Sequence, residues 1–252
     1  MGLFDKLFGN KNANVVTPAS ASASQSVAPT MTIDMSKHSE NLNTVLINMS
    51  KNGKTNMTNH TARVALAMDY SGSMSNMFAN GSVQDVVTRL LPIALKFDDN
   101  GELESWLFSE GYERLEPVAA SNYEKYVKNV MMRARMYMGG TNYAPALRDI
   151  VKYYKDKHPS EIPAFIMFIT DGDNWDESET DAVVRELSNY NMFVQFVGIG
   201  NCDFSYLKSL DNMSGRKHDN TGFIAVKDMN KMDDKQLYTE LLRQYNEWLN
   251  KK

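Results

Sequence analysis

Two short apolar runs, each followed by an aspartate, constrain the fold of this chain more than any other feature. Residues 64–68 are apolar and precede Asp69, and residues 164–169 are apolar and lead through a threonine to Asp171. Continuous apolar runs of this length are typical of strands that are buried on both faces of a parallel sheet. Because parallel strands end at one edge of a sheet, we expect 64–69 and 164–170 to be adjacent central strands that bring the two aspartates together.

The rest of the sequence alternates between helical and strand patterns. Apolar residues recur at helical spacing over 42–49, 83–95, 123–131, 146–154, 180–189 and 233–249. Shorter strand-like runs lie at 103–108, 193–199 and 223–226. This alternation predicts an α/β fold with three layers, in which helices cover both faces of a doubly wound, mostly parallel sheet.

Composition excludes several classes of protein. The net charge of −4 gives no indication of a basic surface for nucleic acid, so we expect none to bind. The single cysteine, Cys202, excludes an internal disulfide and a cysteine-based zinc ribbon. The apolar runs are too short to span a bilayer, and residues 1–30 lack the pattern of a secretory signal. We therefore expect a cytoplasmic protein without stable membrane insertion.

The first thirty residues differ in composition from the remainder of the chain. Residues 17–29 are rich in serine and alanine and have almost no large apolar side chains, which predicts a flexible tail and linker over 1–30. Residues 1–8 carry leucine and phenylalanine on one helical side, a pattern compatible with a docking peptide or with a frayed terminus. We expect one domain over 31–252.

The segment Asp69-Tyr70-Ser71-Gly72-Ser73 carries the most specific chemical signal. A carboxylate and two hydroxyls at alternate positions of a loop can direct three oxygen atoms at one point, which suits Mg²⁺, Mn²⁺ or Ca²⁺. The same residue types also cap helices, so the motif alone leaves both interpretations open.

Two further oxygen-rich turns strengthen the metal interpretation. One is Gly139-Gly140-Thr141-Asn142, which could by itself be an ordinary turn. The other is Asp171-Gly172-Asp173 at the end of a predicted strand. Asp173 and the nearby Asp176 could shape the surroundings of the metal, but we expect them to belong to a solvated acidic loop.

Taken together, the motif, the later Gly-Gly-Thr and the Asp-Gly resemble the metal-ion-dependent adhesion site of von Willebrand factor A domains. The resemblance covers roughly residues 60–250. Within that superfamily the chain resembles the A domain of bacterial tellurium-resistance proteins. The stretches that carry this narrower likeness are 69–74, 81–84, 89–92, 97–101, 139–145 and 195–200, with weaker support from 207–211.

The resemblance implies a role for each site residue. Ser71 and Ser73 would bind the metal through their hydroxyls, and Thr141 would do so in at least one conformational state. Asp69 and Asp171 would act directly or through water. The position left exchangeable on the cation, Mg²⁺ or alternatively Mn²⁺ or Ca²⁺, would accept an acidic side chain of a protein partner. Other tellurium-resistance proteins are candidates for that partner.

The function predicted is therefore a metal-dependent protein-interaction module of bacterial tellurite or stress resistance, without enzymatic activity. A metal-dependent phosphoester hydrolase using Asp69 or Asp171 is one alternative, although no histidine is placed by the sequence to serve as a general base. An adaptor for a separate AAA-type ATPase is the other alternative.

Overall fold

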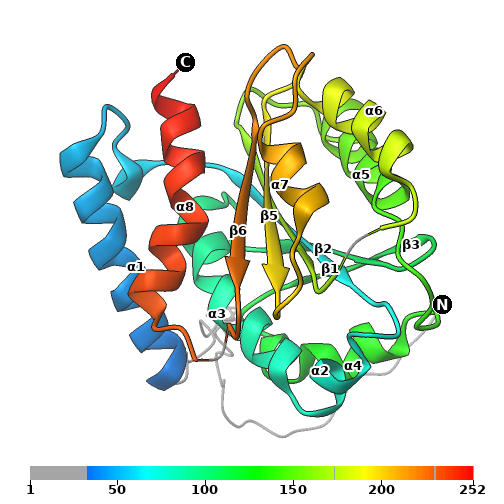
Figure 1. Ribbon diagram of the computed structural model, residues 1–252. Coiled ribbons are helices and arrows are strands. Elements are labelled where there is room, and N and C mark those ends of the chain that lie inside the picture. The colour runs from blue at the N-terminus through cyan, green and yellow to red at the C-terminus, as the bar shows by residue number, and fades with distance from the viewer. Residues whose placement is uncertain (1–32, 173, 230, 252) are drawn as a thin grey trace, which may run out of the picture. The chain divides into compact units, whose positions relative to one another are not determined.

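A six-stranded sheet lies at the centre of the computed structural model, which describes residues 33–172, 174–229 and 231–251 (Figure 1). The strand order is β3-β2-β1-β4-β5-β6, and β3 alone pairs antiparallel. The strands are β1 (Arg63–Asp69), β2 (Leu103–Phe108), β3 (Tyr112–Val118), β4 (Ala164–Thr170), β5 (Met192–Ile199) and β6 (Thr221–Val226). The N-terminal tail predicted for residues 1–30 lies outside the described residues.

The prediction that β1 and β4 are adjacent parallel strands is confirmed. Met68 pairs with Ile169, so both strands end at the same level. The chain builds β2 and β3 on one side of β1 and then crosses to β4 on the other side. The carboxyl ends of β1 and β4 therefore lie where the strand order reverses, the usual position of a binding site in such sheets.

Helices cover both faces of the sheet and complete the three-layer architecture (Figure 1). One face packs against α1 (Ile33–Asn52), α3 (Ser82–Phe97) and α8 (Asp234–Asn250). The other face packs against α5 (Ala144–Lys152), α6 (Glu177–Leu187) and α7 (Ser205–Asp211). The short helices α2 (Ser75–Ala79) and α4 (Tyr126–Asn129) follow in the connections near the carboxyl edge.

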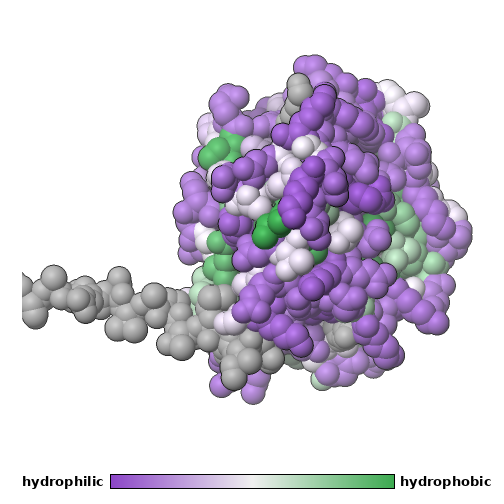
Figure 2. Space-filling view, turned by 90° about the vertical axis from the view of Figure 1, so that its left-hand side faces the viewer, coloured by the Kyte–Doolittle hydropathy of each residue, from purple (hydrophilic) through white to green (hydrophobic). Residues whose placement is uncertain are grey.

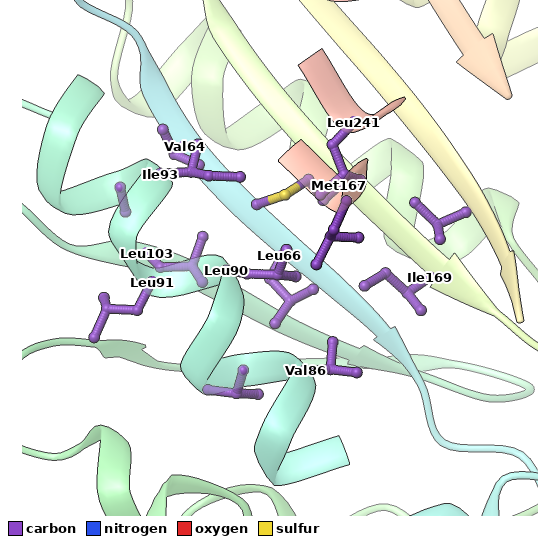
Figure 3. Close-up of a cluster of buried hydrophobic side chains, with 14 of the residues drawn as sticks. Val64, Leu66, Val86, Leu90, Leu91, Ile93, Leu103, Met167, Ile169 and Leu241 are labelled. Atoms are coloured by element: carbon purple, nitrogen blue, oxygen red, sulfur yellow. The ribbon is translucent and has the colours of Figure 1, made fainter. Parts of the chain in front are cut away.

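Side chains of the central strands alternate between two apolar layers, as the strand geometry requires. Val64 and Leu66 point toward α1, α3 and α8, where they meet Leu90 of α3 and Leu241 of α8 (Figure 3). The alternate residues of β1, Ala65 and Ala67, belong to the layer under α5, α6 and α7. Both strand faces are thus buried, which explains the continuous apolar runs in the sequence.

A buried ion pair joins the three helices on the first face. Arg89 of α3 donates to Asp234 of α8 at 2.9 Å, and the ring of His38 on α1 shares a 2.7 Å hydrogen bond with the same carboxylate. Outside this contact, the side of the molecule that carries α1 is mainly hydrophilic, with apolar residues in small separate places (Figure 2). In the described part of the chain, no helix is both long and apolar enough to cross a membrane.

The sequence did not predict β3, α2 or α7. β3 is an edge strand whose residues are mostly half-exposed and include Glu113, Arg114 and Pro117, a composition typical of protected edges rather than of buried strands. The helix predicted over 123–131 is broken into short helical segments. There, Gln84 of α3 donates to the carbonyl of Tyr123 and accepts from the amide of Val127, so tertiary contacts replace helical hydrogen bonds.

Candidate functional site

Asp69 forms the buried base of the site at the carboxyl end of β1. Its carboxylate accepts a 2.7 Å hydrogen bond from the amide of Ser71 and a 2.6 Å hydrogen bond from the hydroxyl of Thr170. The side chain is fully buried, and this burial raises the pKa of Asp69 to about 6 despite the two donors. Nearby Asp171 raises the pKa of Asp69 further.

Ser71, Ser73 and Asp171 form a chain of oxygen atoms above Asp69. The two serine hydroxyls are 3.0 Å apart, and the Ser73 hydroxyl donates to Asp171 Oδ1 at 2.8 Å. Ser71 is buried, Asp171 is half-buried and Ser73, which bonds to both, is exposed, so these oxygen atoms lie where the interior meets the surface. The structure therefore brings together the ends of β1 and β4 through the side chains that the sequence singled out.

The loop that carries Thr141 lies against the Ser71 loop. The amide of Gly72 donates to the carbonyl of Gly139 at 2.9 Å, and Ser71 and Gly139 form an isolated parallel bridge. The carbonyl of Thr141 accepts from the amide of Trp175, which connects this loop to the segment after β4. All three oxygen-rich turns thus meet at one edge of the sheet.

The donor set fits a hard divalent cation. The side chains of Asp69, Ser71, Ser73 and Asp171 present only hydroxyl and carboxylate oxygens, the ligands that Mg²⁺, Mn²⁺ and Ca²⁺ prefer. Among the described residues, no group of three or more His, Cys, Asp or Glu side chains is placed to hold a metal.

Asp176 corrects one interpretation of the sequence, because it does not belong to a solvated loop. Its carboxylate accepts the amides of Tyr143 and Ala144 at 2.9 and 2.8 Å, and so caps the start of α5. It also accepts from the side chains of Asn174 and Thr180. Asp176 therefore holds the loop before α5, which carries Thr141, against the segment after β4; Asp173 lies outside the described residues.

We expect Asp176→Ala to lower the free energy of unfolding by about 2 kcal/mol. The substitution removes two hydrogen bonds that cap α5, and the side-chain amide of Asn174 loses its carboxylate acceptor. Thermal unfolding of the variant should show a fall in melting temperature of roughly 5 °C. Glu179→Ala, at an exposed position of α6, is the matched control and should leave the melting temperature nearly unchanged. A melting temperature equal to that of the control would contradict the capping role.

Sequence reasoning missed several residues around the site. Thr170 donates to Asp69, but nothing in the sequence separates it from an ordinary strand residue. Trp175 is the one large apolar residue in the polar stretch 171–179, and this contrast could have marked it as a candidate functional residue. Its side chain is 75% exposed and packs over Gly140.

The parallel sheet, its two helical layers and the three loops at its carboxyl edge define a von Willebrand A domain. A family described as "vWA found in TerF C terminus" matches residues 61–252, and the chain belongs to this vWA-TerF-like family. YcbR, an uncharacterized protein of Bacillus subtilis (strain 168), is 38% identical over 198 residues, which are 78% of this chain and 81% of YcbR.

Solved structures support the fold at low sequence identity. The VWA domain of SpRpn10 has a TM-score of 0.53 at 11% identity, and the match covers 73% of this chain and 95% of that domain. The manganese-loaded TRAP protein of Plasmodium vivax has a TM-score of 0.53 at 15% identity, covering 75% of this chain and 74% of that one. Proximal thread matrix protein 1 of the mussel byssus, solved with a zinc-occupied MIDAS motif, has a TM-score of 0.51 at 13% identity. The match covers 75% of this chain but only 46% of that longer protein.

Proposed function

We propose that this chain binds a divalent cation, Mg²⁺ in the first instance, at the edge where β1 and β4 end. Ser71 and Ser73 would hold the cation through their hydroxyls, joined by Thr141, with Asp69 and Asp171 acting directly or through water. The observation that carries the proposal is the chain of hydroxyl and carboxylate oxygens that joins Ser71, Ser73 and Asp171 at hydrogen-bond distances. Manganese and zinc in the related folds support a divalent cation without selecting one.

We propose that the bound cation recruits an acidic side chain of a protein partner. Neutral hydroxyls compensate the charge of a divalent cation only in part, so an incoming carboxylate is favoured. In contrast, the metal-free edge carries the carboxylates of Asp69 and Asp171, which would repel another acid. Partner binding should therefore depend on the metal.

We further propose a role in bacterial tellurite or stress resistance, in the cytoplasm, with other tellurium-resistance proteins as candidate partners. Membership of the vWA-TerF-like family supports a protein of this type. We infer an interaction module rather than a phosphoester hydrolase. A hydrolase would need a general base positioned at the metal. The hydrogen bonds of His38 and His60 place their rings beside Asp234 and Tyr245 of α8 rather than beside Asp69 or Asp171. The domain proposed for this role comprises residues 31–252.

Calorimetric titration of the full chain with Mg²⁺ and Mn²⁺ tests the metal site, and saturable binding of one ion per chain is the expected result. A pull-down in Mg²⁺ and in chelator tests the bridge, because the partner should be retained only with the metal. Capture of an AAA-type ATPase would favour the adaptor alternative. Metal-dependent hydrolysis of a generic phosphoester, lost with Asp171→Ala, would favour the enzyme instead.

A further inference from the structure

Three exposed side chains converge on the glycine pair next to the metal loops. Tyr137 and Trp175 are 71% and 75% exposed, and Glu110 is exposed as well. A methyl group added to Gly139 would lie 3.1 Å from Glu110 Oε1 and 3.2 Å from Tyr137 Cε2. One added to Gly140 would lie 2.2 Å from the Trp175 ring. We call Glu110, Tyr137 and Trp175 the aromatic cluster.

The aromatic cluster is fixed in place by the loops that form the proposed metal site. The amide of Gly140 donates to Glu110 Oε1 at 3.2 Å, and the side chain of Asn142 donates to the carbonyl of Glu110 at 3.0 Å. The amide of Trp175 donates to the carbonyl of Thr141. Gly139, in the loop that carries Thr141, forms a β-bridge with Ser71 of the loop after β1, so the cluster lies directly beside the predicted metal ligands.

Two exposed aromatic rings and a carboxylate, all beside the glycine pair, are complementary to a cation on a side chain. Aromatic faces attract Lys and Arg, and a carboxylate adds an ion pair. The ion pairs found among the described residues do not include Glu110. Elsewhere in the molecule the same chemistry is used internally, where Arg114 lies 4.6 Å from the ring centre of Tyr153.

We propose that the aromatic cluster binds a lysine or arginine side chain that the partner presents within a few residues of the carboxylate bound by the metal. This assignment rests on the proposed metal-bridged function and adds the chemistry of the partner segment. The cation would select the acidic residue, and the cluster would select its basic neighbour. Neither the metal nor the cluster alone distinguishes such a segment from an ordinary acidic or basic peptide.

The test uses the full chain and a phage-displayed library of random peptides, bound in Mg²⁺ and eluted with chelator. The eluted peptides should carry Asp or Glu together with Lys or Arg within about three residues. Selection on Glu110→Gln combined with Trp175→Ala should retain the acidic residue and lose the basic one. A basic preference that survives in this variant, or an apolar neighbour in place of the basic one on the native chain, would overturn the assignment.

A synthetic peptide from the selection then measures how much the cluster contributes to affinity. Its affinity should fall about tenfold or more in the double variant, as expected for the loss of an interface anchor. Ile47→Ala, an exposed apolar position on α1, is the control and should leave the affinity unchanged. Mg²⁺ affinity of the double variant must also be unchanged; if it falls, the cluster only supports the metal loop and the proposal fails.

Tryptophan fluorescence provides an independent readout. Trp106 and Trp248 are buried, so Trp175 is the tryptophan accessible to acrylamide. The peptide should protect Trp175 from quenching, and replacing the basic residue of the peptide by alanine should abolish the protection. Gly140→Ala, which displaces the Trp175 ring without removing it, should weaken the binding of the same peptide.

The phage selection distinguishes failure of this inference from failure of the proposed function. Acidic peptides that bind without a basic neighbour would leave the metal bridge intact and refute this inference alone. If no peptide is eluted by chelator, both are refuted.

Discussion

Replacing Ser71 and Ser73 together by alanine is expected to lower Mg²⁺ affinity at least about 100-fold while the fold is retained. Both hydroxyls are proposed to contact the cation, and alanine offers no oxygen in their place. The substitutions remove the bond between the two hydroxyls and the exposed bond from Ser73 to Asp171, so the free energy of unfolding without metal should fall by only about 1 kcal/mol. Calorimetry measures the affinity, and thermal unfolding in chelator measures the stability.

Ser75→Ala is the matched control for this double variant. Ser75 lies in the same segment, is exposed and starts α2, and it is not among the predicted ligands. Its Mg²⁺ affinity should match that of the native chain. Unchanged Mg²⁺ affinity in the Ser71→Ala, Ser73→Ala protein would refute the site, whereas lost metal with retained partner binding would refute only the carboxylate bridge.

In the absence of metal, the protein is expected to lose stability as the pH rises from 4 to 6. The pKa of Asp69 is raised to about 6 in the folded protein by burial, compared with about 4 in the unfolded chain. Between these values the folded state binds more protons than the unfolded state, so stability falls with rising pH. The difference between the two pKa values corresponds to a total loss of about 3 kcal/mol, nearly complete by about pH 7.

Comparison with Asp69→Asn isolates this effect, because Asp98 also has a pKa raised to about 6 by burial and titrates in the same range. An asparagine at position 69 keeps an oxygen for the amide of Ser71 and carries no charge at any pH. Chemical denaturation in chelator should show the variant gaining on the native chain by about 2 kcal/mol between pH 4 and pH 7. Equal pH profiles of the two proteins would show that Asp69 does not titrate in this range. Saturating Mg²⁺ should remove most of the difference, because the cation favours the ionised carboxylate.

The parts of the fold that the sequence predicts are those with a regular apolar pattern, which are the central strands and the helices that cover them. β1 and β4 are visible because residues 64–68 and 164–169 are all apolar, and Asp69 at the end of β1 and Asp171 just after β4 stand out by contrast. β3 was not predicted because an edge strand is partly solvated and needs no apolar pattern. The start of α5 could not be predicted from the local sequence either, because its cap is Asp176, more than thirty residues later in the chain.

In the candidate site, too, the sequence predicts the local motif but not the neighbours that distant segments bring to it. The pattern of Asp69, Ser71 and Ser73 is local, and it was sufficient to find the loop. The neighbours that surround this loop are supplied by other loops, as with Glu110 and Trp175 at the glycine pair. Their meeting depends on the order of the strands, which no short stretch of sequence encodes.

The bond from Ser73 to Asp171 joins residues 98 positions apart, and that from Thr170 to Asp69 spans 101. During synthesis, the first half of the site therefore leaves the ribosome long before the second half exists. A cation or a partner that encounters the unfinished chain finds isolated serines on a disordered loop, with no opposing carboxylate. The proposed recognition at this edge thus requires that β4 has already inserted beside β1. A chain that is truncated or misassembled in the sheet would not bind the proposed partner, and so would not compete with intact molecules for it.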